Sequence, residues 1–271
     1  MIRVAISSLV WFSFLLVLLG CTPTEEKQST GPDQAEQATT YDISTEEINY
    51  FENSSGWLAK PLSAGVYPGI VLIHEWWGLN KNIKEMSIRL ASQGYTVLAV
   101  DLFNGRIATT SEEAQRLSSS VDDEKAIDNM QAAVANLKNQ QQASAIASIG
   151  WCFGGGRSLQ LALSGQKMDA TVIYYGNLVT DESKLIAINW PVLGIFGEKD
   201  DSIPVADVND FDLVLDKLGI ENEIYIYEDV GHAFANPSNP KHDVNKAKDA
   251  LEKTMDFLDK HLKQNETHPP E

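Results

Sequence analysis

The most specific motif of this sequence, and the best indicator of its fold, is Gly150-Trp151-Cys152-Phe153-Gly154-Gly155-Gly156. Residues 145–151 form an apolar run typical of a buried strand, and residues 157–164 have helical spacing. A Gly-x-nucleophile-x-Gly turn between a strand and a helix needs small flanking residues, because the backbone turns sharply to expose its central side chain. Here the central residue is Cys152, and the following helix N-terminus would stabilise its thiolate.

A structural interpretation of the same stretch stays open. Free cysteines are often buried and inert, and glycines at this position would also allow the helix to pack closely on the sheet. The three consecutive glycines do not form a P-loop, because no Gly-Lys-Ser/Thr follows them.

Strand and helix patterns alternate on both sides of this turn. Helices separated by β-branched runs predict an α/β protein with a mostly parallel central sheet and helices on both faces. In such a sheet, the chemistry lies on loops beyond the carboxyl ends of the strands. We expect strands at 48–51, 56–59, 69–74, 95–100, 145–151, 170–175, 192–197 and 223–227, and helices at 82–92, 111–139, 157–164, 205–218 and 244–262.

Two further strand ends carry the partners that a cysteine nucleophile needs. Asp200 lies in Gly197-Glu198-Lys199-Asp200-Asp201-Ser202-Ile203-Pro204, and His232 lies in Gly231-His232-Ala233-Phe234. An imidazole manages the proton of the nucleophile and a carboxylate orients the imidazole. Singly, one could be a helix cap and the other a loop histidine. Their order after the nucleophile is that of the α/β-hydrolase architecture, which favours a catalytic triad.

Together with His74-Glu75-Trp76-Trp77-Gly78, these motifs resemble the dienelactone hydrolase family. The resemblance extends over about residues 48–262 and implies the α/β-hydrolase fold. It implies Cys152 as nucleophile, His232 as general base and acid, and Asp200 as the orienting carboxylate, because the family places its aspartate four residues before a proline, here Pro204. It implies no metal and no organic cofactor.

The resemblance also assigns residues around the triad. Glu75 matches a family glutamate that takes the thiol proton when substrate binds, and the backbone N–H groups of Trp76 and Phe153 would form the oxyanion hole. Trp77 is a candidate wall of the substrate pocket, although simple packing would explain it equally. A metal role for the His-Glu pair fails, because His-Glu-x-x-His would need a histidine in place of Gly78.

The substrate-binding arginines of the family are matched incompletely. Asn236 stands where the family has an arginine shortly after the catalytic histidine, and an amide cannot form a bidentate ion pair with a carboxylate. Arg106 is the candidate for the other arginine, although an exposed loop arginine is the more ordinary interpretation. We therefore expect a carboxylic-ester hydrolase, similar to carboxymethylenebutenolidase, that cleaves a small ester, lactone or thioester through an acyl-enzyme; dienelactone itself is doubtful.

Two other functions are alternatives to hydrolysis on this fold. A non-catalytic small-molecule-binding lipoprotein on the same fold would need a pocket, but not cysteine, aspartate, histidine and glutamate together. A peptidase similar to prolyl oligopeptidase would carry a propeller, which this sequence does not encode, and cysteine in place of serine makes amide cleavage less favourable.

The N-terminal residues predict export. Residues 9–19 are almost wholly apolar and follow Arg3, as in a signal peptide over residues 1–20 that is too short for a stable membrane span. Leu18-Leu19-Gly20-Cys21 resembles a bacterial lipobox, so we expect lipidation at Cys21 and a membrane-anchored lipoprotein facing the periplasm or cell exterior. An ordinary signal peptide or a signal anchor is the alternative. Residues 21–40 would be a flexible polar tether, 41–265 the hydrolase domain and 266–271 a disordered tail.

Composition excludes several other classes. The 271 residues include 21 Lys and Arg against 38 Asp and Glu, and a net charge of −17 disfavours a nucleic-acid partner. A hydrophobic fraction of 43% excludes a disordered chain. Two cysteines cannot form a disulfide framework, and no Cys/His cluster has zinc-site spacing. The expected partners are a small ester or lactone and the membrane, and no pattern indicates an oligomeric state.

Overall fold

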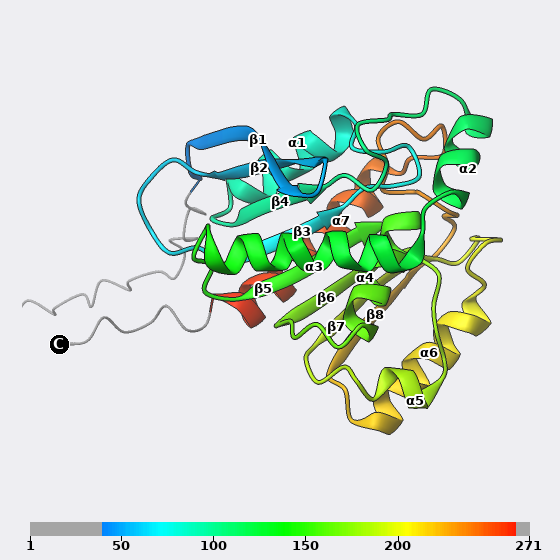
Figure 1. The fold of residues 1–271 in the computed structure, drawn as a ribbon. Coiled ribbons are helices and arrows are strands. Elements are labelled where there is room, and N and C mark those ends of the chain that lie inside the picture. Colours follow the sequence, from blue (N-terminus) through cyan, green and yellow to red (C-terminus); the bar gives the residue numbers. More distant parts are fainter. Residues whose placement is uncertain (1–39, 264–271) are drawn as a thin grey trace, which may run out of the picture. The chain divides into compact units, whose positions relative to one another are not determined.

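A mixed sheet of eight strands, in the order β1-β2-β4-β3-β5-β6-β7-β8, forms the centre of the computed structural model (Figure 1). The pairs β1–β2 and β2–β4 are antiparallel, and all other neighbouring pairs are parallel. The strands are β1 (Ile43–Phe51), β2 (Ser54–Pro61), β3 (Gly69–Ile73), β4 (Thr96–Val100), β5 (Ile146–Trp151), β6 (Ala170–Tyr174), β7 (Val192–Gly197) and β8 (Asn222–Tyr227). This is the α/β-hydrolase arrangement expected from the sequence.

The structure describes residues 40–263. The signal peptide, the lipidation site Cys21, almost all of the tether and the C-terminal tail therefore lie outside the described residues. Between residues 40 and 263, no helix is both long and apolar enough to cross a bilayer.

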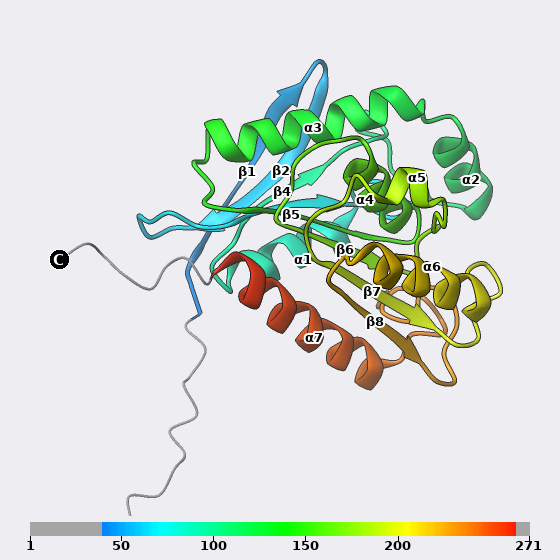
Figure 2. The same ribbon diagram turned by 90° about the horizontal axis from the view of Figure 1, so that it is seen from below.

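Helices cover both faces of the sheet (Figure 2). They are α1 (Lys81–Ala91), α2 (Ser111–Ser119), α3 (Asp123–Asn139), α4 (Phe153–Leu163), α5 (Glu182–Leu185), α6 (Val205–Leu218) and α7 (Val244–Leu262). Side chains of α3, α4 and α6 share one core cluster with Val71 and Ile73 of β3, while α1 and α7 share the other with Ile70 and Leu72. Alternation along a strand that is buried on both faces thus divides the core into two layers.

Most expected elements are confirmed, but some bounds differ, and β1 begins at Ile43 rather than at residue 48. The helix expected over residues 111–139 is two helices, because Asp122 accepts a hydrogen bond from the Lys125 backbone N–H (2.9 Å) and so caps a new helix, α3. Helix α4 begins at Phe153, immediately after Cys152, rather than at residue 157. The short helix α5 was not expected.

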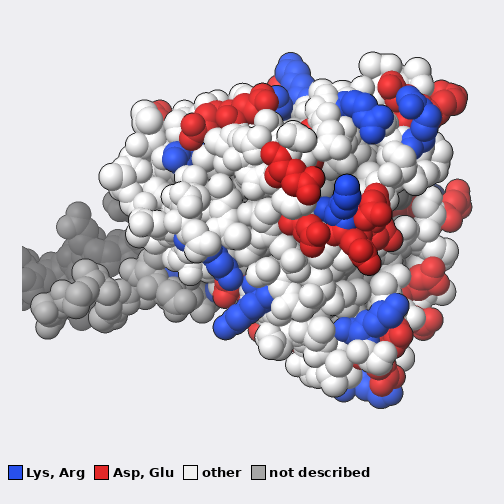
Figure 3. Space-filling view, in the orientation of Figure 1, with Lys and Arg blue, Asp and Glu red and all other residues white. Residues whose placement is uncertain are grey.

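Charged side chains are distributed over the surface. On the face seen in Figure 3, many acidic clusters lie beside lysine or arginine side chains. Ion pairs such as Lys217–Glu182 (2.5 Å) account for part of this arrangement. Exposed ion pairs of this kind add little to the stability of the fold. Most of the stability therefore comes from the sheet and its two core layers, which hold the site in place.

Candidate active site

A sharp turn between β5 and α4 presents Cys152. Its backbone has φ +56° and ψ −117°, a strained conformation for a residue with a side chain. A Cβ on Gly150 would lie 2.1 Å from the carbonyl oxygen of Gly154, and a Cβ on Gly154 would lie 2.4 Å from that of Ile73. The glycines are therefore a steric requirement, and they allow the half-buried thiol to stand at the start of a helix.

Three strand ends bring the nucleophile, histidine and acid together. The Sγ of Cys152 lies 3.0 Å from Nε2 of His232, and Nδ1 of His232 lies 2.7 Å from Oδ2 of Asp200. An Asp carboxylate only accepts, so Nδ1 donates and Nε2 is left facing the thiol. Burial alone would lower the pKa of His232, but the hydrogen bonds with Asp200 and Cys152 outweigh it and raise the pKa to about 10. The imidazole is therefore strongly basic.

Asp200 is held in one orientation. Its Oδ1 accepts hydrogen bonds from the backbone N–H groups of Ser202 (2.8 Å) and Ile203 (3.1 Å), which leaves Oδ2 for His232. The Asp200 side chain is fully buried, whereas the neighbouring Asp201 is exposed. Fixing the carboxylate also fixes the imidazole ring.

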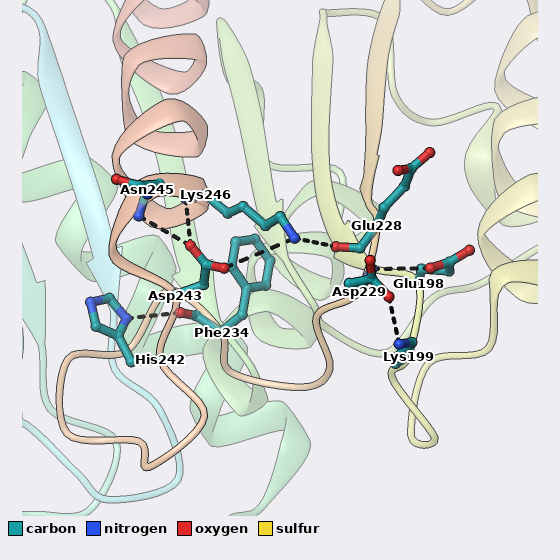
Figure 4. Close-up of polar contacts among 9 residues, drawn as sticks. All are labelled: Glu198, Lys199, Glu228, Asp229, Phe234, His242, Asp243, Asn245 and Lys246. Carbon is teal, nitrogen blue, oxygen red and sulfur yellow. Dashed lines mark hydrogen bonds and ion pairs between the residues drawn. The ribbon is translucent and has the colours of Figure 1, made fainter.

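The loops that carry Asp200 and His232 are joined to each other (Figure 4). The backbone N–H of Asp229 donates to the Glu198 carboxylate (3.0 Å), and Lys199 Nζ lies 2.5 Å from the Asp229 carboxylate. Lys246, near the start of α7, donates to the carbonyl oxygen of Glu228 (2.6 Å). These contacts hold the segment just before His232 against the loop that follows β7 and against α7.

Glu75 follows β3 and is buried, with 5% of its surface exposed. The side-chain amide of Asn236 donates a hydrogen bond to its carboxylate. Burial raises the pKa of Glu75 to about 7, although the charge of His232 and the Asn236 hydrogen bond oppose the rise. The sequence indicated Asn236 only as a missing arginine; its role as the partner of Glu75 joins residues too far apart in the chain for a local pattern to show.

His74 holds the backbone of Glu75. The Leu102 backbone N–H donates to Nε2 of His74 (3.1 Å), so Nε2 is unprotonated and Nδ1 carries the proton. Nδ1 then donates to the carbonyl oxygen of Glu75 (2.6 Å). Complete burial lowers the pKa of His74, which favours this neutral form.

Two backbone N–H groups are free to bind an oxyanion. Trp76 lies just after β3, and Phe153 is the first residue of α4. Within residues 40–263, neither N–H donates a hydrogen bond. Both residues line the same cavity as Cys152, where an oxyanion would need such donors.

A cavity of about 730 Å³ opens over Cys152 and His232. Trp77 lines it, together with Glu75, Trp76, Cys152, Phe153 and His232. Arg106 does not: it lines a separate cavity of about 290 Å³ with Trp57 and Lys84, and its Nε donates to the Phe103 carbonyl oxygen (3.3 Å).

Sequence reasoning did not identify Tyr175. Its ring lies edge-on to His232, with centroids 5.2 Å apart, and it lines the catalytic cavity. Among residues 40–263 its buried hydroxyl has no hydrogen-bond partner. Tyr175 directly follows strand β6, and the apolar sequence of that strand gives no signal for a contact with His232.

No group of three or more potential ligands that could hold a metal ion occurs within the described part of the chain. The strand ends gather a thiol, an imidazole and two carboxyl groups, and Trp76 and Phe153 line the same cavity as the thiol.

Comparisons with known proteins identify the family of this chain. Residues 55–262 match the model of the dienelactone hydrolase family. A Methylorubrum extorquens protein provisionally named carboxymethylenebutenolidase is 30% identical over 216 residues, which cover 74% of each chain. A Klebsiella pneumoniae crystal structure, provisionally named dienelactone hydrolase, has a TM-score of 0.71 at 25% identity and covers 80% of this chain and 98% of that one. The metagenomic protein P91, described as a dienelactone hydrolase-like promiscuous phosphotriesterase, has a TM-score of 0.73 at 22% identity, covers 81% of this chain and 98% of its own, and supports the fold. With the fold, the site and the family match in agreement, this chain belongs to the dienelactone hydrolase family.

Proposed function

We propose that this hydrolase cleaves small carboxylic esters, lactones or thioesters through a covalent acyl-enzyme on Cys152. The observation that carries the proposal is the continuous contact from Cys152 Sγ to His232 (3.0 Å) and on to Asp200 (2.7 Å), with Cys152 and His232 lining the cavity. Simple binding of a small molecule needs no such relay. The Methylorubrum extorquens relative is provisionally named carboxymethylenebutenolidase, and this name denotes a hydrolysis of the same class.

The first half-reaction forms the acyl-enzyme. The thiolate of Cys152 attacks the carbonyl carbon, and the carbonyl electron pair moves to oxygen, where the N–H groups of Trp76 and Phe153 stabilise the negative charge. When the tetrahedral intermediate collapses, the bond to the leaving oxygen or sulfur breaks. Protonated His232 gives its proton to that atom, and the acyl group stays on sulfur.

The second half-reaction releases the acid. His232 takes a proton from water, the resulting hydroxide attacks the thioester carbon, and the carbon–sulfur bond breaks to restore the Cys152 thiolate. Asp200 keeps the imidazole in one tautomer and orientation in both steps, because its other oxygen is held by two backbone N–H groups.

Glu75 controls the proton of the thiol in this proposal. A carboxyl with a pKa of about 7 is partly ionised at neutral pH, so it can accept a proton from Cys152 when substrate enters. Its hydrogen-bond partner is the uncharged Asn236, and the charge of His232 lowers the pKa of Glu75 by less than burial raises it. The ionised form of Glu75 is then the active one.

The proposed location rests on the sequence of residues 1–21 alone: export, acylation of Cys21 and attachment to a membrane surface. Metabolic labelling with a radioactive fatty acid should mark the wild type and not Cys21→Ser. Equal labelling of the two proteins would contradict the lipid anchor.

Hydrolysis of p-nitrophenyl acetate tests the proposed chemistry. The full-length protein in mild detergent is compared with its Cys152→Ala and Cys152→Ser variants. We expect sustained turnover in the wild type and none in the alanine variant. Equal rates in all three proteins would contradict the nucleophile, and a single burst without turnover would favour a binding protein.

A further inference from the structure

The wall of the catalytic cavity is uncharged apart from the reacting groups. No lysine or arginine is among its lining residues within 40–263, and the ionisable residues that line it are Glu75, Cys152, Tyr175 and His232. A carboxylate on the substrate would therefore find no lysine or arginine to pair with. Both ring nitrogens of His232 are already hydrogen-bonded to Asp200 and Cys152, and ionised Glu75 would repel the carboxylate. The nearby cations Lys84 and Arg106 line the separate cavity.

The polar part of the wall consists of amides and hydroxyls. The Asn177 side chain and the Ser202 hydroxyl make no hydrogen bonds within residues 40–263, and only Oδ1 of Asn80 is occupied, by the Ile83 backbone N–H (3.2 Å). An amide side chain both donates and accepts, as does an alcohol hydroxyl, whereas a carboxylate only accepts and an ammonium only donates. This wall complements hydroxyl groups better than charges.

The apolar part of the wall is aromatic. Trp76 and Trp77 are half-buried and pack edge to face, with centroids 5.2 Å apart, and Phe153 lies on the same cavity. Flat apolar surfaces beside a few polar groups suit a ligand that is itself amphipathic, such as a ring with C–H faces and hydroxyl edges. At about 730 Å³, the cavity has room for such a ring next to the ester.

Building on the proposed function, we infer that the natural substrate is an uncharged ester of a polyhydroxylated compound, such as an acylated sugar. The amides and hydroxyls hold the hydroxyl groups, the indole rings pack against the C–H face, and the ester carbonyl lies at Cys152. A carboxylate-bearing ester or lactone is the poorer substrate.

Matched substrates test this inference on the full-length protein. Methyl glucopyranoside acetylated on its primary hydroxyl is compared with cyclohexylmethyl acetate, which has the same ester on a ring without hydroxyls. We expect kcat/KM to be about tenfold higher for the sugar ester, because a bound ring displaces water from the exposed Asn177 and Ser202 side chains and only sugar hydroxyls replace those hydrogen bonds. p-Nitrophenyl hemisuccinate should have a kcat/KM about tenfold below that of p-nitrophenyl acetate.

A variant pair links the preference to the wall. Asn177→Leu should lower the ratio of kcat/KM for the sugar ester to that for cyclohexylmethyl acetate by about fivefold. The control is Asn49→Leu, which replaces an exposed asparagine of β1 that does not line the cavity. It should leave that ratio unchanged.

The outcomes separate this inference from the proposed function. If p-nitrophenyl acetate is turned over but the two ring acetates react equally, or the hemisuccinate is preferred, the substrate class is wrong and the hydrolase stands. If not even p-nitrophenyl acetate is turned over, the proposed function fails and the substrate class fails with it.

Discussion

Replacing Glu75 by glutamine should stabilise the protein at alkaline pH and leave its stability almost unchanged at acid pH. Glu75 is 5% exposed, and burial raises its pKa from 4.5 to about 7. The folded protein therefore holds this proton more tightly than the unfolded chain does. That contribution to stability is complete below about pH 4.5 and is lost as the pH rises through about 7.

The size of the effect follows from the same two values. At about 1.36 kcal/mol per pH unit, the rise from 4.5 to about 7 corresponds to about 3 kcal/mol of unfolding free energy lost by the wild type. Glutamine has the shape of the neutral acid and never ionises, so Glu75→Gln keeps this stability. For a domain of this size, the melting temperature should be roughly 6–12 °C above that of the wild type at alkaline pH.

Thermal unfolding followed by circular dichroism, at about pH 5 and about pH 8, measures the difference. Glu47→Gln is the matched control, because it removes an exposed carboxyl from β1. We expect the curves of wild type and Glu75→Gln to diverge with rising pH, and those of wild type and control to stay parallel. If Glu75→Gln also runs parallel to the wild type, the carboxyl does not titrate as a buried group and the reasoning fails.

Three further predictions concern the geometry of the site. Asp200→Asn keeps an acceptor for the two backbone N–H groups but loses the carboxylate that orients the catalytic imidazole, so kcat should fall by about 10⁴ with little change in melting temperature; a fall below tenfold would argue against the triad. Gly154→Ala places a Cβ 2.4 Å from a carbonyl oxygen of β3 and should cost about 1–3 kcal/mol in a denaturant titration, whereas Gly156→Ala, whose nearest neighbour is 3.3 Å away, should cost less; equal costs would contradict the close approach. The kcat/KM for p-nitrophenyl acetate should rise with pH through about 7, as Glu75 ionises, and Asn236→Asp should move this rise to higher pH because it adds a like charge; an unmoved profile would exclude Glu75 as the titrating group.

The part of the site that could be predicted from sequence is the part with local steric requirements. Glycines at 150 and 154 are needed wherever a strand turns sharply into a helix, so their spacing around Cys152 indicated the turn directly. The buried strands were equally clear, because long apolar runs between helices occur in few other settings.

What the sequence did not show depends on contacts between distant segments. Asn236 and Glu75 are separated by 161 positions, and only the fold brings the amide to the carboxylate. Arg106 was a candidate for substrate binding, with an exposed loop arginine as the more ordinary interpretation, and it lines the separate cavity. The end of α2 was missed because polar spacing continues across it, although Asp122 is an ordinary N-cap residue.

The most direct test of the central claim is mass spectrometry of the protein quenched in acid during turnover of p-nitrophenyl acetate. The account predicts one acetyl group on the wild type, which peptide mapping assigns to Cys152, and none on Cys152→Ala. An acetyl group on any other residue, or turnover by Cys152→Ala at the wild-type rate, would contradict covalent catalysis at Cys152.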